Sequence, residues 1–181
     1  MQEVYHYSEN PDIAVFEPRA PLAHPEVEPL VWAIDAMHSP LYYFPRDCPR
    51  VCFWNLPTTT PEDRERWLGT TDAPIVITIE KAWVTRLQTT KLYRYIFSDA
   101  EFLHTGDHGV AVSRTPQYPL RVEPLGNLLE AILNSPIELR LCPSLVPLAN
   151  ALLQTTLHYS LIRMRNAQGW TGGSGSPVVP P

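Results

Sequence analysis

Residues 31–50 read VWAIDAMHSPLYYFPRDCPR, and the interpretation of the whole chain starts from this stretch. It opens as an apolar strand and continues through polar, titratable and aromatic side chains to two prolines and a cluster of charges. Such a dense set of polar and flat side chains directly after a hydrophobic strand is typical of a ligand cleft. A buried layer of tyrosines with paired charges has the same composition, so both interpretations stay open.

The composition indicates a globular chain. Its 181 residues suit one domain with a sizeable core, and its content is 44% hydrophobic and 18% charged. The net charge of −5 argues against extended nucleic-acid binding, which needs a broad basic surface. The 20 prolines predict many short elements and few long helices, because proline breaks helix interiors.

The cysteines, the N-terminal sequence and the length of the apolar runs indicate the cellular compartment. Cys48, Cys52 and Cys142 are too few for a disulfide framework, and plain buried thiols are the simpler interpretation. The N-terminus lacks the pattern of a signal peptide, and no apolar run is long enough to span a membrane. We therefore expect a cytoplasmic protein with no membrane partner.

Alternation and β-branched runs predict strands, and capping patterns predict helices. The predicted strands cover residues 4–8, 30–34, 50–56, 74–80, 91–97, 110–113, 120–122 and 137–141. One helix has Thr60 as its N-cap, Pro61 at its first position and Gly69 as its stop. Further helical segments are expected at 81–87 and 127–133, and the longest candidate runs from Ser144 to about residue 159.

These elements predict an α+β fold with a bent or split antiparallel-rich sheet, closed by a C-terminal helix–strand–helix element. We expect a single globular domain over residues 1–166. Residues 167–181, with GGSGS and PVVPP, have too little to bury and are expected to form a flexible Gly/Pro-rich tail.

Two segments resemble known proteins. VYHYS at 4–8 resembles the first motif of the ADP-ribosyltransferase fold in its histidine-bearing branch, and residues 31–43 resemble its second motif, an aromatic-rich strand followed by an aspartate, a serine and a tyrosine. Over nearly its full length the chain also resembles an uncharacterised bacterial family of unknown function. The segments that carry this second resemblance are YHYSENPDI, FEPR, VWAID, HSPLYYFPRDCPRV and SLIRMRN.

The transferase resemblance implies an NAD site. His6 would hold the ribose hydroxyls with Ser8 nearby, and Tyr43 or Tyr42 would stack on the nicotinamide ring. Transfer at a sugar carbon needs a carboxylate beside the developing positive charge. The chain departs from the family here: Glu123 lies later than expected, and Glu80 is the alternative.

The predicted catalytic residues are His6, Tyr43 and Glu123. The predicted cofactor-binding residues are Ser8, Arg19, Asp35, His38, Ser39, Tyr42, Arg46 and Arg50. Each has a simpler structural interpretation. Asp35 and His38 suit a helix cap with an internal hydrogen bond, and Arg46 and Arg50 suit a structural ion pair with Asp47, or else a phosphate fork.

A loop at 104–109, HTGDHG, has the atoms for a metal site, but its glycines indicate a turn, and no metal is predicted. Two functions follow as hypotheses. The first is an NAD-binding ADP-ribosyltransferase-like enzyme or a degenerate relative. The second is a non-catalytic module that binds a small anion or a partner. The expected partner molecule is a small nucleotide or a phosphorylated ligand.

Overall fold

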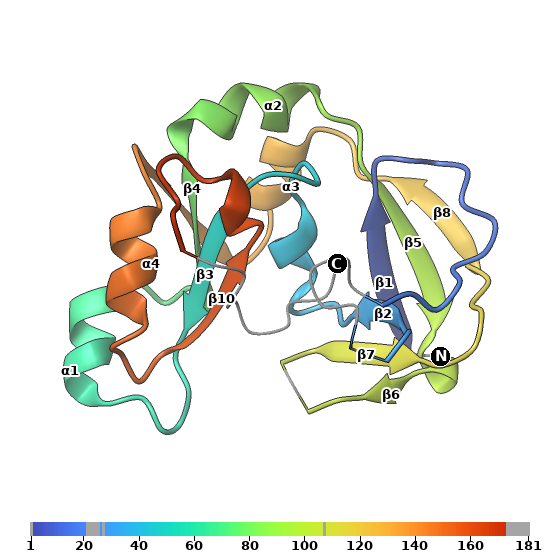
Figure 1. The fold of residues 1–181 in the computed structure, drawn as a ribbon, viewed down its shortest axis with the longest axis horizontal. Helices are drawn as coiled ribbons and strands as arrows, with labels where there is room; N and C mark the ends of the chain where they lie inside the picture. Colours follow the sequence, from blue (N-terminus) through green and yellow to red (C-terminus); the bar gives the residue numbers. More distant parts are fainter. Residues whose placement is uncertain (1, 21–25, 27, 107, 173–181) are drawn as a thin grey trace. The chain divides into compact units, whose positions relative to one another are not determined.

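The computed structural model describes residues 2–20, 26, 28–106 and 108–172 (Figure 1). The described chain divides into two compact units. Unit 1 runs to Arg46 and resumes from Thr90 to Leu128, and unit 2 takes Asp47–Thr89 and the described residues 129–172. Each unit has a β-sheet of its own, so the chain is an α+β protein whose sheets are mainly antiparallel.

The strands are β1 (Glu3–Ser8), β2 (Val31–Ile34), β3 (Arg50–Trp54), β4 (Ile75–Glu80), β5 (Tyr93–Ser98), β6 (Leu103–His104), β7 (Val110–Ser113), β8 (Arg121–Pro124), β9 (Ile137–Cys142) and β10 (His158–Ile162). The α-helices are α1 (Pro61–Asp63), α2 (Val84–Thr89), α3 (Leu128–Leu133) and α4 (Val146–Leu152). Short 3-10 turns are η1 (Ser39–Tyr42), η3 (Lys81–Trp83), η4 (Asp99–Glu101) and η5 (Met164–Asn166), and η2 (Arg64–Leu68) is a π-helical turn.

Unit 1 is built on a six-stranded antiparallel sheet in the order β6-β7-β2-β1-β5-β8. The central strand β1 pairs with β5 at every position from Glu3 to Ser8. With β2, by contrast, it pairs at one position only, Tyr5 with Ile34. The sheet is therefore opened between its two central strands beyond this pair.

The two faces of this sheet carry different side chains, because successive residues of a strand point to opposite sides. One face packs Val4, Tyr95 and Phe97 around Phe16, whose backbone forms a bridge with Gln117. The other face gathers Ile34, Val110 and Val112 together with tyrosines of β1. A single strand, β1, thus contributes to two separate clusters.

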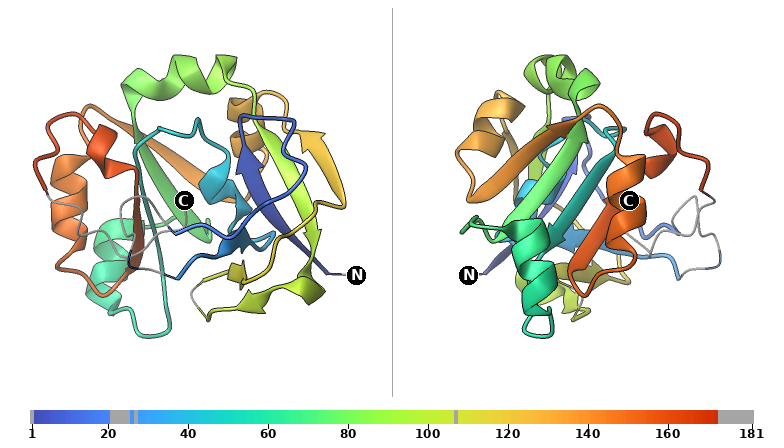
Figure 2. Two further views of the ribbon diagram at one scale, coloured as in Figure 1. Left: turned by 45° about the vertical axis from the view of Figure 1, so that its right-hand side comes forward. Right: turned by 90° about the vertical axis from the view of Figure 1, so that its left-hand side faces the viewer.

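Unit 2 has a four-stranded sheet in the order β10-β3-β4-β9. Its β4–β9 pair is parallel, and its other pairs are antiparallel. Helix α4 lies over this sheet (Figure 2), where Leu145, Ala149 and Leu152 pack against Val51 and Phe53 of β3. The core of unit 2 lies between this helix and the sheet.

The predicted helix start at Thr60 is confirmed. The Thr60 hydroxyl accepts a hydrogen bond from the Asp63 backbone N–H, and Pro61 occupies the first position. The helix continues as η2 and ends at Gly69, whose φ of 58° favours glycine. Asp63 also accepts hydrogen bonds from the hydroxyl and the backbone N–H of Thr156, which ties α1 to the segment before β10.

The prediction of one long helix from Ser144 to about residue 159 is wrong. Helix α4 ends at Leu152, and the chain returns as β10, which pairs with β3 from His158 to Ile162. Residues 154–156 are Gln, Thr and Thr, and β-branched threonines are poor helix formers. Leu157, an apolar residue of the predicted helix, instead precedes this strand and is buried in the core of unit 2.

At the C-terminal end, Ala167 is 7% exposed and Trp170 packs against the core of unit 2. Residues 173–181, the greater part of the expected tail, lie outside the described residues. In the part of the chain that the structure describes, no helix has the length and apolar character needed to cross a bilayer.

Candidate functional site

The opening between β1 and β2 is occupied by His6. Its Nδ1 lies 2.9 Å from the backbone oxygen of Trp32. A carbonyl oxygen only accepts, so Nδ1 carries the proton and donates it, which leaves Nε2 as the ring atom available for other contacts. The His6 ring also packs edge-on against Phe16, with 4.8 Å between ring centroids. Strand β1 therefore holds the imidazole in one orientation.

A small hollow lies at the same opening. It is lined by Tyr5, His6, Tyr7, Trp32, Ala33, Ile34 and Tyr42, and its volume is about 20 Å³. A space of that size accommodates one water-sized polar group. The structure thus brings His6 together with Tyr42, the alternative stacking residue of the sequence prediction.

The aromatic wall of the hollow comes from β1 and from the turn η1. This turn begins at Ser39, with Pro40 at its second position, and ends at Tyr42. The rings of Tyr7 and Tyr42 are parallel within 4°, with centroids 6.5 Å apart. Tyr43 lies edge-on to Tyr7 at 5.4 Å but does not line the hollow. Tyr42 rather than Tyr43 is therefore the tyrosine placed at the opening.

Two residues that line the hollow carry a buried hydrogen-bond donor to which no partner is assigned among the described residues. These donors are the Tyr7 hydroxyl and the Trp32 indole N–H, and both have almost no accessible surface. The Tyr7 hydroxyl lies beside Ser39 and Tyr43, neither of which lines the hollow. Burial, with the neighbouring Tyr43, raises the pKa of Tyr7, so its hydroxyl stays protonated at neutral pH.

Two arginines act on His6 from outside the sheet. Burial lowers the pKa of His6, and the positive charges of Arg46 and Arg19 lower it further, against the hydrogen bond to Trp32. Arg19 is placed by a backbone bridge to Leu30, just before β2. Arg46 is placed by its backbone N–H, which donates to Glu9 Oε1 at 2.8 Å. The predicted residues His6, Arg19 and Arg46 therefore share one electrostatic environment.

These two guanidinium groups differ from the others of unit 1. Arg94, Arg114 and Arg121 each bind a carboxylate. Arg19 and Arg46 are exposed, and within the described residues neither guanidinium group forms an ion pair or a hydrogen bond. Unit 1 thus presents two exposed guanidinium groups that have no ion-pair partner among the described residues and whose charges act on His6.

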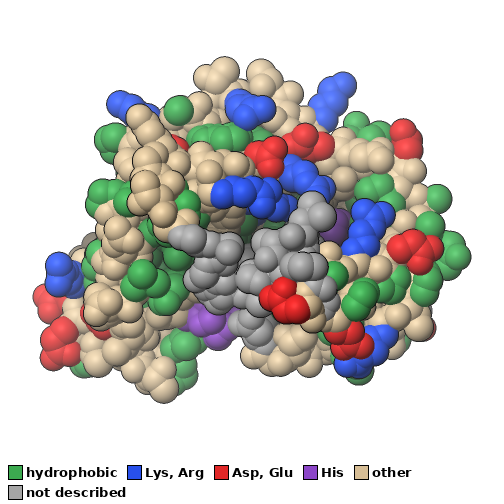
Figure 3. Space-filling view, viewed as in Figure 1, with side chains coloured by type: hydrophobic (Ala, Val, Ile, Leu, Met, Phe, Trp, Pro, Cys, Tyr) green, Lys and Arg blue, Asp and Glu red, His purple; other side chains and the backbone are tan. Residues whose placement is uncertain are grey.

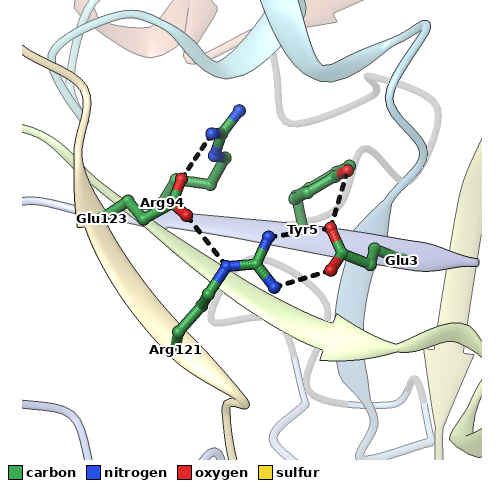
Figure 4. A network of polar contacts seen from close by, with 5 residues as sticks. All are labelled: Glu3, Tyr5, Arg94, Arg121 and Glu123. Atoms are coloured by element: carbon green, nitrogen blue, oxygen red, sulfur yellow. Dashed lines mark hydrogen bonds and ion pairs between the residues drawn. The ribbon is translucent and has the colours of Figure 1, made fainter. Parts of the chain in front are cut away.

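Glu123 belongs to a separate network (Figure 4). Its carboxylate accepts hydrogen bonds from Arg94 and Arg121, and Arg121 also binds Glu3, which accepts from the Tyr5 hydroxyl. The hydrogen bond from Arg94 and then that from Arg121 lower the pKa of Glu123. The predicted catalytic carboxylate is held by two arginines and does not line the hollow with His6.

The predicted residues after β2 form a turn. One oxygen of Asp35 accepts from the His38 backbone N–H at 2.8 Å and lies 2.9 Å from His38 Nδ1, and the Ser39 hydroxyl donates to the Asp35 carbonyl. Burial opposes ionisation of Asp35, but the hydrogen bonds from His38 outweigh it and lower the pKa of this carboxyl. Gly109 packs so closely that a Cβ there would lie 2.4 Å from His38 Nδ1.

Three further predicted residues are not among those that line the hollow. Ser8 is buried and accepts a hydrogen bond from the Asn10 backbone N–H, which makes a local turn. Arg50 lies in β3 of unit 2, where it is 4% exposed and donates to the Cys48 carbonyl. Glu80, the alternative carboxylate, also belongs to unit 2 and accepts from the backbone N–H groups of Leu145 and Gln168.

The other candidate features of the sequence are accounted for structurally. Cys48 and Cys52 are buried, and burial raises the pKa of each thiol to about 12, so neither is reactive at neutral pH. His104 binds Asp99, while Asp107 lies outside the described residues. Among the residues that the structure describes, no three His, Cys, Asp or Glu side chains are placed to hold a metal ion.

The sequence prediction of the site did not include Tyr7 and Trp32, which line the hollow. For Tyr7 the available signal was alternation, which places the residues that flank His6 on the other side of β1. The charges give no single-sign field on the face shown in Figure 3, where the visible acidic and basic side chains are interspersed. The positive character beside His6 is therefore local.

Comparison with known proteins adds a family but no activity. No curated protein and no solved structure matches the chain. The similarity to ADP-ribosyltransferases stays a prediction, because none of the comparisons shows it. A family model described as "Family of unknown function (DUF6886)" matches residues 5–167. This match covers most of the 181 residues and confirms the resemblance to an uncharacterised family: the chain belongs to the DUF6886 family.

Proposed function

We propose that unit 1 binds a small phosphorylated ligand of the nucleotide type at the opening between β1 and β2. The observation that carries this proposal is the coincidence of His6, which lines an aromatic hollow, with two arginines that lack a carboxylate partner among the described residues. Arginine suits phosphate because its planar guanidinium donates two parallel hydrogen bonds. The aromatic wall suits a flat ring.

The two arginines, His6 and Tyr42 would each contact a different part of the ligand. Arg19 and Arg46 attract the phosphate, and their positive charge favours an anion beside the imidazole. His6 is fixed by its bond to the Trp32 carbonyl, so Nε2 is presented without further loss of side-chain freedom. Tyr42 supplies an aromatic face at the edge of the hollow. The hollow of about 20 Å³ takes only one edge of a ring, so most of the ligand lies outside it.

NAD is one ligand of this class, and its binding is the part of the transferase resemblance that this proposal retains. Transfer of the ADP-ribosyl group needs in addition a carboxylate beside the reacting sugar carbon. Glu123 is bound by Arg94 and Arg121, and Glu80 is bound by backbone N–H groups of unit 2. The proposal therefore concerns binding without catalysis, as in the second of the two hypotheses.

The test is a calorimetric titration of the full chain with ADP, with NAD and with pyrophosphate. The decisive variant is the double substitution Arg19→Gln and Arg46→Gln. We expect it to weaken binding by about tenfold, since two exposed ion pairs contribute up to about 1 kcal/mol each.

The matched control is Arg114→Gln, because Arg114 is also an exposed arginine of unit 1 but is bound to Glu28. This control should leave the affinity unchanged. Absence of binding by the wild type at millimolar ligand contradicts the proposal. Equal affinities for the double variant and the wild type also contradict it.

A further inference from the structure

The ring of His6 has one nitrogen that the fold leaves without a partner. Nδ1 donates to the Trp32 carbonyl, and Nε2 has no hydrogen-bond partner among the described residues. The buried side-chain atoms that lack a partner in this part of the chain belong to Tyr7, Trp32, Thr78 and Arg94. Because His6 Nε2 has no partner and is not one of these buried atoms, it keeps accessible surface. It can therefore reach a ligand.

The hydrogen bond to Trp32 also fixes the chemical form of this nitrogen. Because Nδ1 carries the ring proton, Nε2 carries the lone pair of the neutral ring. Burial lowers the pKa of His6, and the charges of Arg46 and Arg19 lower it further, so the ring is neutral at neutral pH. Nε2 is therefore a nucleophile that needs no base to remove a proton from it.

The charges that act on His6 suit a phosphoryl donor. Such a donor is an anion, and phosphoryl transfer depends on positioning and on positive charge that stabilises the transferred group. Arg19 and Arg46 are exposed, their charges act on the His6 ring, and neither has an ion-pair partner among the described residues. They can thus hold the phosphate of a donor beside a neutral nucleophile.

Two other histidines of unit 1 have the opposite setting. His38 Nδ1 lies 2.9 Å from Asp35 Oδ1, and His104 Nε2 lies 2.7 Å from Asp99 Oδ1. In each case a carboxylate engages one ring nitrogen, and its negative charge repels an incoming phosphate. His6 differs from both because its partner is an uncharged carbonyl group.

We infer that His6 accepts a phosphoryl group at Nε2. This inference rests on the proposed phosphate site, which holds the donor beside the ring. With phosphoramidate as the donor, the lone pair of Nε2 forms the new bond to phosphorus, and the phosphorus–nitrogen bond of the donor breaks. The protonated nitrogen of the donor leaves as ammonia with the electron pair of that bond. His6 keeps its Nδ1 proton, so the ring gains the positive charge that the leaving nitrogen loses.

The Trp32 carbonyl stabilises the product of this step. Once Nε2 bonds to phosphorus, the ring is positively charged, and its Nδ1–H becomes a stronger donor to the Trp32 oxygen 2.9 Å away. The transferred phosphoryl group keeps its negative charges, which Arg19 and Arg46 can bind. The same contacts that orient the ring for attack thus favour the phosphorylated form.

The test is incubation of the full chain with phosphoramidate, followed by mass spectrometry of its peptides. We expect His6 to be phosphorylated about tenfold faster than His104, the matched control, whose Nε2 is held by Asp99. His6→Gln should remove the modification from the N-terminal peptide. In the wild type, the couplings between phosphorus and the ring protons should assign the new bond to Nε2.

Two further measurements separate the phosphate site from general reactivity of the ring. The double substitution Arg19→Gln and Arg46→Gln should slow phosphorylation of His6 about tenfold and leave that of His104 unchanged. Saturating pyrophosphate should protect His6 in the wild-type chain, a result that depends on no substitution and so on no altered fold.

The outcomes distinguish the inference from the proposed function. The inference is overturned if His6 is not phosphorylated, if His104 reacts as fast as His6, or if phosphorus is attached to Nδ1. It is also overturned if neither pyrophosphate nor the arginine substitutions change the rate at His6. In all these cases, pyrophosphate binding in the calorimetric titration leaves the proposed phosphate site standing. Absence of pyrophosphate binding overturns the proposed function itself and the inference with it.

Discussion

At the scale of single residues, the lowered pKa of His6 makes the free energy of unfolding depend on pH. Its pKa is lowered by burial and by Arg46 and Arg19, so the folded protein resists protonation of this ring. A group with a depressed pKa contributes stability that is present above its ordinary pKa, about 6.5 for histidine, and is lost as the pH falls below it. We expect urea denaturation to show a smaller free energy of unfolding at about pH 5.5 than at about pH 7.5. His6→Gln should lose less stability over the same pH interval, and an equal loss would show that His6 does not contribute.

Gly109 gives a second prediction at this scale. Its φ is +82°, and a Cβ there would lie 2.4 Å from His38 Nδ1 and 2.7 Å from Asp35 Oδ1. Gly109→Ala should therefore reduce the free energy of unfolding by more than about 2 kcal/mol, from backbone strain and collision together. Gly106→Ala is the control, because Gly106 has a similar φ of +78° but open space around its Cβ position. Similar losses from both substitutions would mean that the contact with the Asp35–His38 pair is unimportant.

At the scale of elements, Glu80 joins two segments of unit 2. Its carboxylate is 4% exposed and accepts from the backbone N–H of Leu145, just before α4, at 3.3 Å and from that of Gln168 at 2.9 Å. Glu80→Ala leaves these N–H groups without their acceptor and should cost about 1–3 kcal/mol of unfolding free energy. Glu80→Gln retains one acceptor oxygen and should cost clearly less in the same urea titration. A cost for Gln as large as that for Ala would assign the effect to charge rather than to the hydrogen bonds.

The same scale shows what sequence can and cannot predict here. The helix start at Thr60 was predictable because the cap, Pro61 and Gly69 act within a few residues of one another. Strand β10 was missed because its apolar spacing fits a helix as well as a strand, and only pairing with β3 decides between them. Local chemistry is visible in a sequence, whereas a partner about a hundred residues away is not.

At the scale of the whole molecule, the α+β class and the mainly antiparallel sheets followed from the order of the elements. The residues of the proposed site were anticipated only in part. His6, Arg19, Arg46 and Tyr42 were named from the sequence, but the assignment of Arg50 and Glu80 to unit 2 depends on where the chain passes from one unit to the other, between Arg46 and Asp47. A single sequence gives no signal for that passage. The unpaired donors of Tyr7 and Trp32 likewise become visible only when every hydrogen bond is assigned.

The central claim is that an anion binds beside His6 between Arg19 and Arg46. The most direct measurement is the pKa of the His6 ring, followed through its ring-proton resonances in a pH titration with and without pyrophosphate. A bound anion favours the charged imidazole, so we predict a higher pKa for His6 in the presence of pyrophosphate than in its absence. An identical pKa of His6 under both conditions, at pyrophosphate concentrations that saturate the binding measured by calorimetry, would contradict the account.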